Sequence, residues 1–274
     1  MVPFRSPAAM RLRVPRATPL EIWRLELETG DTFSRAVRRK PERILEGLLL
    51  LHSGRGQTRD GRTDHHICAG YAHLVIGGGR AVAVDDAILA QGPTGFTRLP
   101  DAFIGESGGH ALAAQHGFRP EETMVVDLGQ TAIKVSYAGR RCRLPRDQKR
   151  LPRGRVASSR QSEQRDVLRD FLADAIHQGR AGQAAPGVVI FALPGEVAAS
   201  ATPGKSTYAG TRGYAGLCWD ALLAAGTKPK MVGVLNDAEL AAASASQLPE
   251  ALGKTLVITL GFGLGASLLA PASP

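Results

Sequence analysis

The stretch Val125-Val126-Asp127-Leu128-Gly129-Gln130-Thr131-Ala132-Ile133-Lys134 decides how this chain is interpreted. An apolar run ends at an aspartate, a glycine follows, and alternation of apolar and polar residues resumes, which predicts a strand, a tight turn and a second strand. Gly129 lets the backbone approach an anion closely, and Thr131 adds a hydroxyl group. Lys134 adds a cation, and Asp127 can hold a hydrated magnesium ion. The stretch therefore predicts a phosphate-binding hairpin, and an ordinary hairpin with a glycine turn is the alternative.

A second glycine-rich turn is expected within Thr259-Leu260-Gly261-Phe262-Gly263-Leu264-Gly265. Glycines at alternate positions after a strand weaken a sheet unless a ligand or another backbone segment approaches closely. The N–H groups of such a turn can surround an anion, and a threonine hydroxyl can position water or a metal. The candidate phosphate ligands here are Thr259, Gly261, Gly263 and Gly265. A bulged hairpin without a ligand is the alternative.

Two further segments follow predicted strands. Gly77-Gly78-Gly79 comes directly after an apolar run, and it fits a nucleotide that lies against the backbone; a plain loop is the alternative. Asn236-Asp237 comes between a predicted strand and an alanine-rich helix. Asp237 can act as a general base toward a substrate hydroxyl, with Asn236 binding a neighbouring hydroxyl. The alternative is that Asp237 only caps the helix.

Composition limits the fold class. The chain has 274 residues, of which 43% are hydrophobic, so it can form one large domain or two ordinary ones. Predicted strands and helices alternate along the chain, which indicates an α/β protein. Residues 22–27 are predicted to be a strand, because apolar and polar residues alternate there. No apolar run approaches the roughly 20 residues that cross a bilayer, so we expect no membrane contact.

The net charge of +9 is concentrated in a few segments. Residues 138–160 contain nine Lys and Arg and one Asp, and we interpret them as a solvated loop, with contact to a polyanion as the alternative. No zinc finger, stacking-aromatic motif or helix-turn-helix pattern accompanies this charge, so nucleic acid is not an expected partner. Three widely spaced cysteines and no secretory h-region lead us to expect a cytoplasmic protein.

Four segments resemble, in this order, motifs of the actin-like ATPase superfamily, and within it those of the ROK (repressor, open reading frame, kinase) sugar kinases. Residues 127–134 resemble the first phosphate motif, Asp-Ile-Gly-Gly-Thr-Lys, and residues 192–195 (Ala-Leu-Pro-Gly) resemble the Val-Pro-Gly turn. Residues 235–242 resemble the Asn-Asp-Ala-Asn-Ala-Ala stretch that carries the catalytic aspartate. Residues 259–265 resemble the second phosphate motif, Thr-x-Gly-Thr-Gly-x-Gly, with Phe262 in place of threonine.

The order of the other segments suggests a circular permutation. Residues 71–79 look like the family's late adenosine motif, residues 100–117 like its closing helix, and residues 29–39 like the helix start that follows the second phosphate motif. In the family all three come after the phosphate motifs, whereas here they come first. The resemblance therefore implies an irregular N-terminus (1–19), an adenosine-side lobe (20–118), and a phosphate and substrate-side lobe with both phosphate motifs (119–274).

The resemblance implies a two-lobed, ribonuclease H-like α/β fold with ATP between the lobes, and an ATP-dependent sugar kinase that uses Mg²⁺. Asp237 would be the catalytic base, and Asn236 and Gly195 would bind the sugar. The implied nucleotide ligands are Asp127 (through a water on Mg²⁺), Gly129, Thr131, Lys134, Thr259, Gly261, Gly263, Gly265, Gly77, Gly78 and Gly79. The alternative is a non-catalytic or filament-forming actin-like ATPase, which the missing family zinc motif favours. The sequence leaves the oligomeric state open, with a homodimer among the options.

Overall fold

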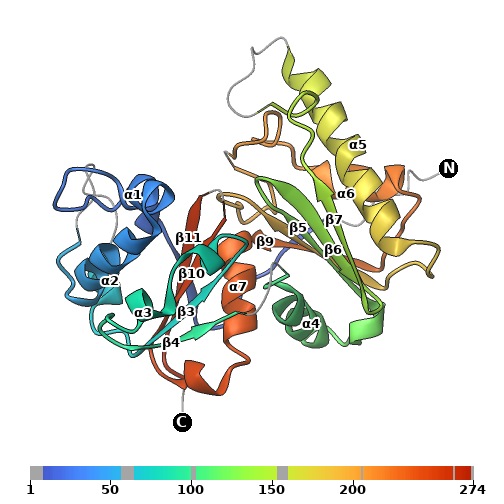
Figure 1. Ribbon diagram of the computed structural model, residues 1–274. Coiled ribbons are helices and arrows are strands. Elements are labelled where there is room, and N and C mark those ends of the chain that lie inside the picture. Colours follow the sequence, from blue (N-terminus) through green and yellow to red (C-terminus); the bar gives the residue numbers. More distant parts are fainter. Residues whose placement is uncertain are drawn as a thin grey trace. The chain divides into compact units, whose positions relative to one another are not determined.

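The computed structural model describes residues 9–56, 65–99, 103–152, 160–204, 206–261 and 263–272 (Figure 1). The chain divides into two compact units, and each is built on one mixed sheet. The first unit comprises Met1–Arg13 and Gly109–Asp237, and the second comprises Val14–Gly108 and Ala238–Pro274. Phe262, residues 153–159 of the basic segment and residues 1–8 lie outside the described residues.

The sheet of the first unit has the strand order β1-β9-β8-β5-β6-β7. Its strands are β1 (Met10–Arg11), β5 (Thr123–Leu128), β6 (Ala132–Tyr137), β7 (Arg140–Pro145), β8 (Val188–Leu193) and β9 (Met231–Asn236). The strands β5, β6 and β7 form an antiparallel meander, while β8 and β9 continue from β5 in parallel, and β1 is parallel to β9. Because β8 is covered on both sides, all six of its residues are buried, as its unbroken apolar sequence requires.

Two helices pack in the first unit, α5 (Gln161–Arg180) and α6 (Leu217–Ala224). Leu168, Phe171, Leu172 and Ile176 recur on α5 at helical spacing, and this apolar stripe is buried. The helix contacts β6, β7 and α6, so the stripe closes the main core of this unit. Figure 1 shows α5 running along the sheet on one face.

The sheet of the second unit has the strand order β2-β11-β10-β3-β4. Its strands are β2 (Ala17–Leu20), β3 (His73–Gly77), β4 (Gly95–Arg98), β10 (Thr255–Leu260) and β11 (Leu264–Leu269). Its helices are α1 (Phe33–Arg39), α2 (Ile44–His52) and α3 (Asp86–Leu89), while α4 (Glu106–Ala114) and α7 (Asp237–Ala245) cross the boundaries between the units. Short 3₁₀ turns complete the described chain: η1 (Ile22–Arg24), η2 (Pro41–Arg43), η3 (His65–Cys68), η4 (Ala81–Ala83), η5 (Pro120–Glu122) and η7 (Pro249–Leu252).

The two sheets share one pattern of neighbours. In the first sheet the central strand is β5, and in the second it is β10. On one side each central strand is followed by two antiparallel strands of a meander, and on the other side by two parallel strands. The shared orders are β7-β6-β5-β8-β9 and β2-β11-β10-β3-β4. In the first unit the meander strands are consecutive along the chain. In the second unit the outer meander strand β2 comes from the beginning of the chain, while β10 and β11 come from its last part.

The structure confirms the mixed α/β class and differs from the sequence prediction in four places. Residues 238–274 group with 14–108, so a boundary near 119 does not separate the two units, because β10 pairs with β3 and β11 with β2. Residues 17–20, which the sequence places mostly in an irregular N-terminus, form β2. Residues 140–145 of the predicted solvated loop form β7, whose Cys142 and Leu144 pack on the core.

Residues 22–27 form a 3₁₀ turn and a short extended segment in place of the predicted strand. Ile22 and Leu25 are fully buried, and their spacing of three residues places both on one side of such a turn. Among the described residues, no helix is long and apolar enough to cross a membrane.

The three cysteines are free thiols in different environments. Burial raises the pKa of Cys68 to about 11 and also raises the pKa of Cys218, whereas Cys142 is only half-buried. Since the thiolate is the reactive form, we expect one thiol to react rapidly with Ellman's reagent at pH 8 in the folded protein, and three after unfolding in guanidinium. Cys142→Ser should remove the rapid phase. Rapid reaction of two or more thiols in the folded protein would contradict this burial.

Candidate functional site

In the first unit, three segments that the sequence predicted to be functional meet at one end of the sheet, where the parallel strands terminate. We call this end the sheet edge. The strands β5, β8 and β9 are parallel neighbours, with Asp127 beside Ala192 and Leu193 beside Asn236. Their carboxyl ends therefore place Asp127, Gly195 and the Asn236-Asp237 pair at the same edge. Ligands of open α/β sheets characteristically bind beyond the carboxyl ends of strands.

An ion pair joins the two strands of the predicted phosphate hairpin. Asp127 and Lys134 are direct cross-strand partners, and Lys134 Nζ lies 2.6 Å from Asp127 Oδ2. Their side chains are only 19% and 17% exposed, so the pair is better shielded from water than a typical surface salt bridge. The carboxylate can supply an oxygen to the hydration shell of Mg²⁺, but the ion must then share this carboxylate with the lysine.

The turn between β5 and β6 is held by residues that sequence reasoning missed. The Tyr208 hydroxyl donates to the Gly129 carbonyl at 2.7 Å, and the Arg146 guanidinium donates to the Gln130 carbonyl at 3.3 Å. A Cβ atom added to Gly129 would lie 2.9 Å from the Ala132 carbonyl oxygen, so the tight turn requires glycine. Neither Tyr208 nor Arg146 stands in a motif, and only their contacts in the folded chain reveal them.

Asn236 makes a contact that links two strand ends. Its Nδ2 donates to the Gly195 carbonyl at 2.5 Å, and Gly195 has a φ of +89°, which favours glycine. Asn236 thereby fixes the turn after β8 next to the start of α7. Asp237 is half-buried at the first position of α7, as the strand-then-helix pattern predicted.

In the second unit, the two other glycine turns lie side by side. Thr259 pairs with Gly77 across the parallel strands β10 and β3, and the Arg80 main-chain N–H donates to the Leu260 carbonyl at 2.9 Å. Gly78 has a φ of +101°, and an added Cβ atom would lie 2.5 Å from the Leu260 carbonyl oxygen. The structure therefore brings 77–79 against the start of 259–265.

A small pocket adjoins these turns, with about 20 Å³ of space for water-sized molecules. Its walls combine buried apolar side chains with two exposed arginines and the glycine turn. The lining residues are Ser34, Val37, Arg38, Pro41, Arg80, Ala83, Val84, Leu260, Gly261, Gly263 and Leu264. Apolar walls, two cations and the glycine turn therefore lie together on this side of the second unit.

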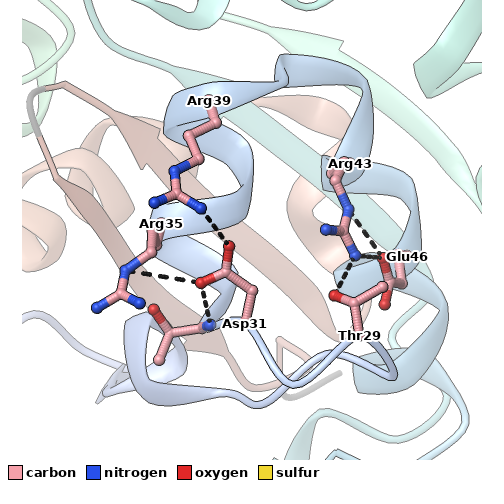
Figure 2. Close-up of polar contacts among 7 residues, drawn as sticks. Thr29, Asp31, Arg35, Arg39, Arg43 and Glu46 are labelled. Atoms are coloured by element: carbon pink, nitrogen blue, oxygen red, sulfur yellow. Dashed lines mark hydrogen bonds and ion pairs between the residues drawn. The ribbon is translucent and has the colours of Figure 1, made fainter.

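Ionic contacts organise the helices beside this pocket (Figure 2). Asp31 accepts the Thr32 main-chain N–H at 3.0 Å and lies 3.6 Å from Arg35 and 3.4 Å from Arg39. Positions 31, 35 and 39 are four residues apart, so these contacts follow one helical face. Arg43 in turn pairs with Glu46 and donates to Thr29 Oγ1 at 2.7 Å, as Figure 2 shows.

Two features limit the chemistry of the described residues. They include no cluster of three or more His, Cys, Asp or Glu side chains that could hold a metal ion. The predicted residues also fall in different units: Asp127, Gly195 and Asn236 lie in the first, and Gly78 and Gly261 in the second.

Comparisons with known proteins add no family to these observations. No family model, no curated protein and no solved structure matches the chain. The functional assignment therefore depends on the geometry of the two sheet edges.

Gly78→Ala should destabilise the second unit, because alanine disfavours the positive φ and its Cβ atom would meet the Leu260 backbone. We expect a loss of about 2 kcal/mol or more, measured by thermal unfolding. Gly79→Ala is the matched control, since its Cβ atom would meet no described atom within 4 Å. That variant should stay within about 0.5 kcal/mol of the parent protein. Equal stability of the two variants would refute the close approach at Gly78.

Proposed function

We propose that this chain is an ATP-dependent phosphotransferase with a circularly permuted, actin-like fold, and that it phosphorylates a sugar hydroxyl. The observation that carries the proposal is the repeated sheet pattern, in which each central strand leads into a glycine turn. A meander followed by parallel strands is the ribonuclease H-like arrangement, and actin-like proteins contain two such units. The position of β2, at the start of the chain but at the edge of the second sheet, supports the permutation.

The second unit is proposed to bind the nucleoside and part of the phosphate chain. Val37, Val84 and Leu264 supply apolar contacts for the adenine ring, and Gly77-Gly78-Gly79 form the backbone beside the adenosine. Arg38 and Arg80 favour the negative charge of the phosphates. Thr259, Gly261, Gly263 and Gly265 are assigned to the phosphates through the threonine hydroxyl and main-chain N–H groups.

The first unit is proposed to act on the transferred phosphoryl group. The N–H groups of the turn at Gly129 and the Thr131 hydroxyl bind phosphate oxygens, while Asp127 accepts a hydrogen bond from water on Mg²⁺. Magnesium supplies neutralisation of the phosphate charge when it is bound with ATP. Lys134 can turn from Asp127 to the phosphate when Mg-ATP binds. The lysine ammonium group would then pair with the phosphate, and the Asp127 carboxylate would face the hydrated magnesium ion.

Asp237 is proposed as the general base. It stands at the carboxyl end of β9, at the same sheet edge as Asp127. Its carboxylate would take the proton from the sugar hydroxyl as the hydroxyl oxygen attacks the γ-phosphorus in line. Asn236 and the Gly195 turn, which are hydrogen-bonded to each other, would hold the sugar.

One observation favours a second candidate function, a non-catalytic or filament-forming actin-like ATPase. The Asn236 amide donates to the Gly195 main chain, so a sugar must compete for that group or bind beside it. An ATPase that keeps the nucleotide turns without a sugar site needs no such rearrangement.

Release of ADP with a panel of hexoses tests the two functions. We expect turnover that requires sugar, and Asp237→Asn should lower it by about 10²–10⁴-fold because the general base is lost. Binding of ATP should survive, since asparagine keeps the size of the side chain. Asp174→Asn, an exposed change on α5 in the same unit, is the matched control and should retain full turnover.

Other results would reassign the chain. Sugar-independent turnover with sedimentable polymer supports the filament-forming ATPase. Full sugar-dependent turnover of Asp237→Asn removes Asp237 from the catalytic role, and failure of the parent protein to bind ATP refutes both functions.

A further inference from the structure

We propose that Arg146 and Tyr208 are positioning residues that hold the 129–131 turn in an anion-binding shape. The inference rests on the proposed function, because it assigns a cause to the phosphate affinity of that turn. Both residues lie in the first unit, and Tyr208 comes from a segment far from the turn in sequence. Arg146 follows β7, and Tyr208 lies between β8 and α6.

Arg146 is buried among main-chain carbonyls, with only 6% of its surface exposed. Its guanidinium donates to the Leu151 and Pro152 carbonyls at 2.8 Å each, and to the Thr207 carbonyl at 2.9 Å. The same group reaches the Gln130 carbonyl of the turn at 3.3 Å. The planar fork of the guanidinium allows one side chain to join these three segments, which the single ammonium group of lysine cannot do.

Tyr208 connects this arginine to the turn. The guanidinium carbon of Arg146 lies 3.8 Å from the centroid of the Tyr208 ring, a cation–π contact, and the ring is 1% exposed. The Tyr208 hydroxyl donates to the Gly129 carbonyl at 2.7 Å. Stacking therefore fixes the ring, and the fixed ring directs its hydroxyl at the turn.

Together these contacts occupy three successive carbonyls of the turn. The Gly129 carbonyl accepts from Tyr208, the Gln130 carbonyl from the Arg146 side chain, and the Thr131 carbonyl from the Arg146 main-chain N–H at 2.9 Å. In a trans peptide the C=O and N–H groups point to opposite sides, so each N–H group that follows one of these carbonyls points away from the donor to that carbonyl. Successive N–H groups on one side of a turn form an anion-binding concavity.

The test compares Tyr208→Phe with Tyr137→Phe. Each variant loses one buried hydroxyl-to-carbonyl hydrogen bond in the first unit, because the Tyr137 hydroxyl donates to the Ala184 carbonyl at 2.9 Å. The melting temperatures should therefore fall by similar amounts. We measure the dissociation constants of Mg-ATP and of adenosine by calorimetry, because only ATP carries the phosphates that the turn binds.

Tyr208→Phe should weaken Mg-ATP binding by about fivefold to tenfold and leave the affinity for adenosine unchanged, while Tyr137→Phe changes neither. Arg146→Lys, which keeps the charge and loses the fork, should show the same selective loss. Parent-like ATP affinity in Tyr208→Phe and Arg146→Lys, or equal losses for ATP and adenosine, overturns the positioning role while the proposed function stands. Failure of the parent protein to bind ATP overturns both.

Discussion

Parallel pairing next to the central strand of each sheet is the constraint on which both candidate sites depend. β5 pairs in parallel with β8, and β10 pairs in parallel with β3. On its other side each central strand turns back into an antiparallel partner. The turn after the central strand must therefore lie beside the carboxyl end of its parallel neighbour. Glycine turns that are far apart in sequence become neighbours in this way, as Gly78 and the Leu260 backbone show.

The two units use different means to hold their turns in place. In the second unit, backbone packs directly on backbone, and only glycine fits at position 78. In the first unit, side chains add to the backbone contacts: Tyr208 and Arg146 donate to the Gly129 and Gln130 carbonyls, and Asn236 donates to that of Gly195. Side-chain contacts of this kind can be adjusted by substitution, whereas the backbone contacts at Gly78 and Gly129 tolerate little change.

Patterns of neighbouring residues correctly predicted the elements whose formation depends on local sequence. Alternation and glycine placement located the 123–137 hairpin, and the strand-to-helix change located Asp237 at the start of α7. The grouping of 238–274 with 14–108 could not be predicted from spacing, because it depends on the pairing of β11 with β2 across the whole first unit. Arg146 lies in a segment rich in basic residues, and composition alone does not reveal that the fold buries this arginine.

The pairing of β2 with β11 also sets an order of events during synthesis. β2 and β3 leave the ribosome long before β10 and β11, the two strands that join them into a sheet. The first unit is encoded almost without interruption between them, so the nascent chain can complete its core while the flanking strands still expose unpaired edges. Long-range pairing of this kind is slow to form. Synthesis of β10 and β11 therefore determines when the second sheet can cover these edges, and chaperones have most to protect in the interval before it.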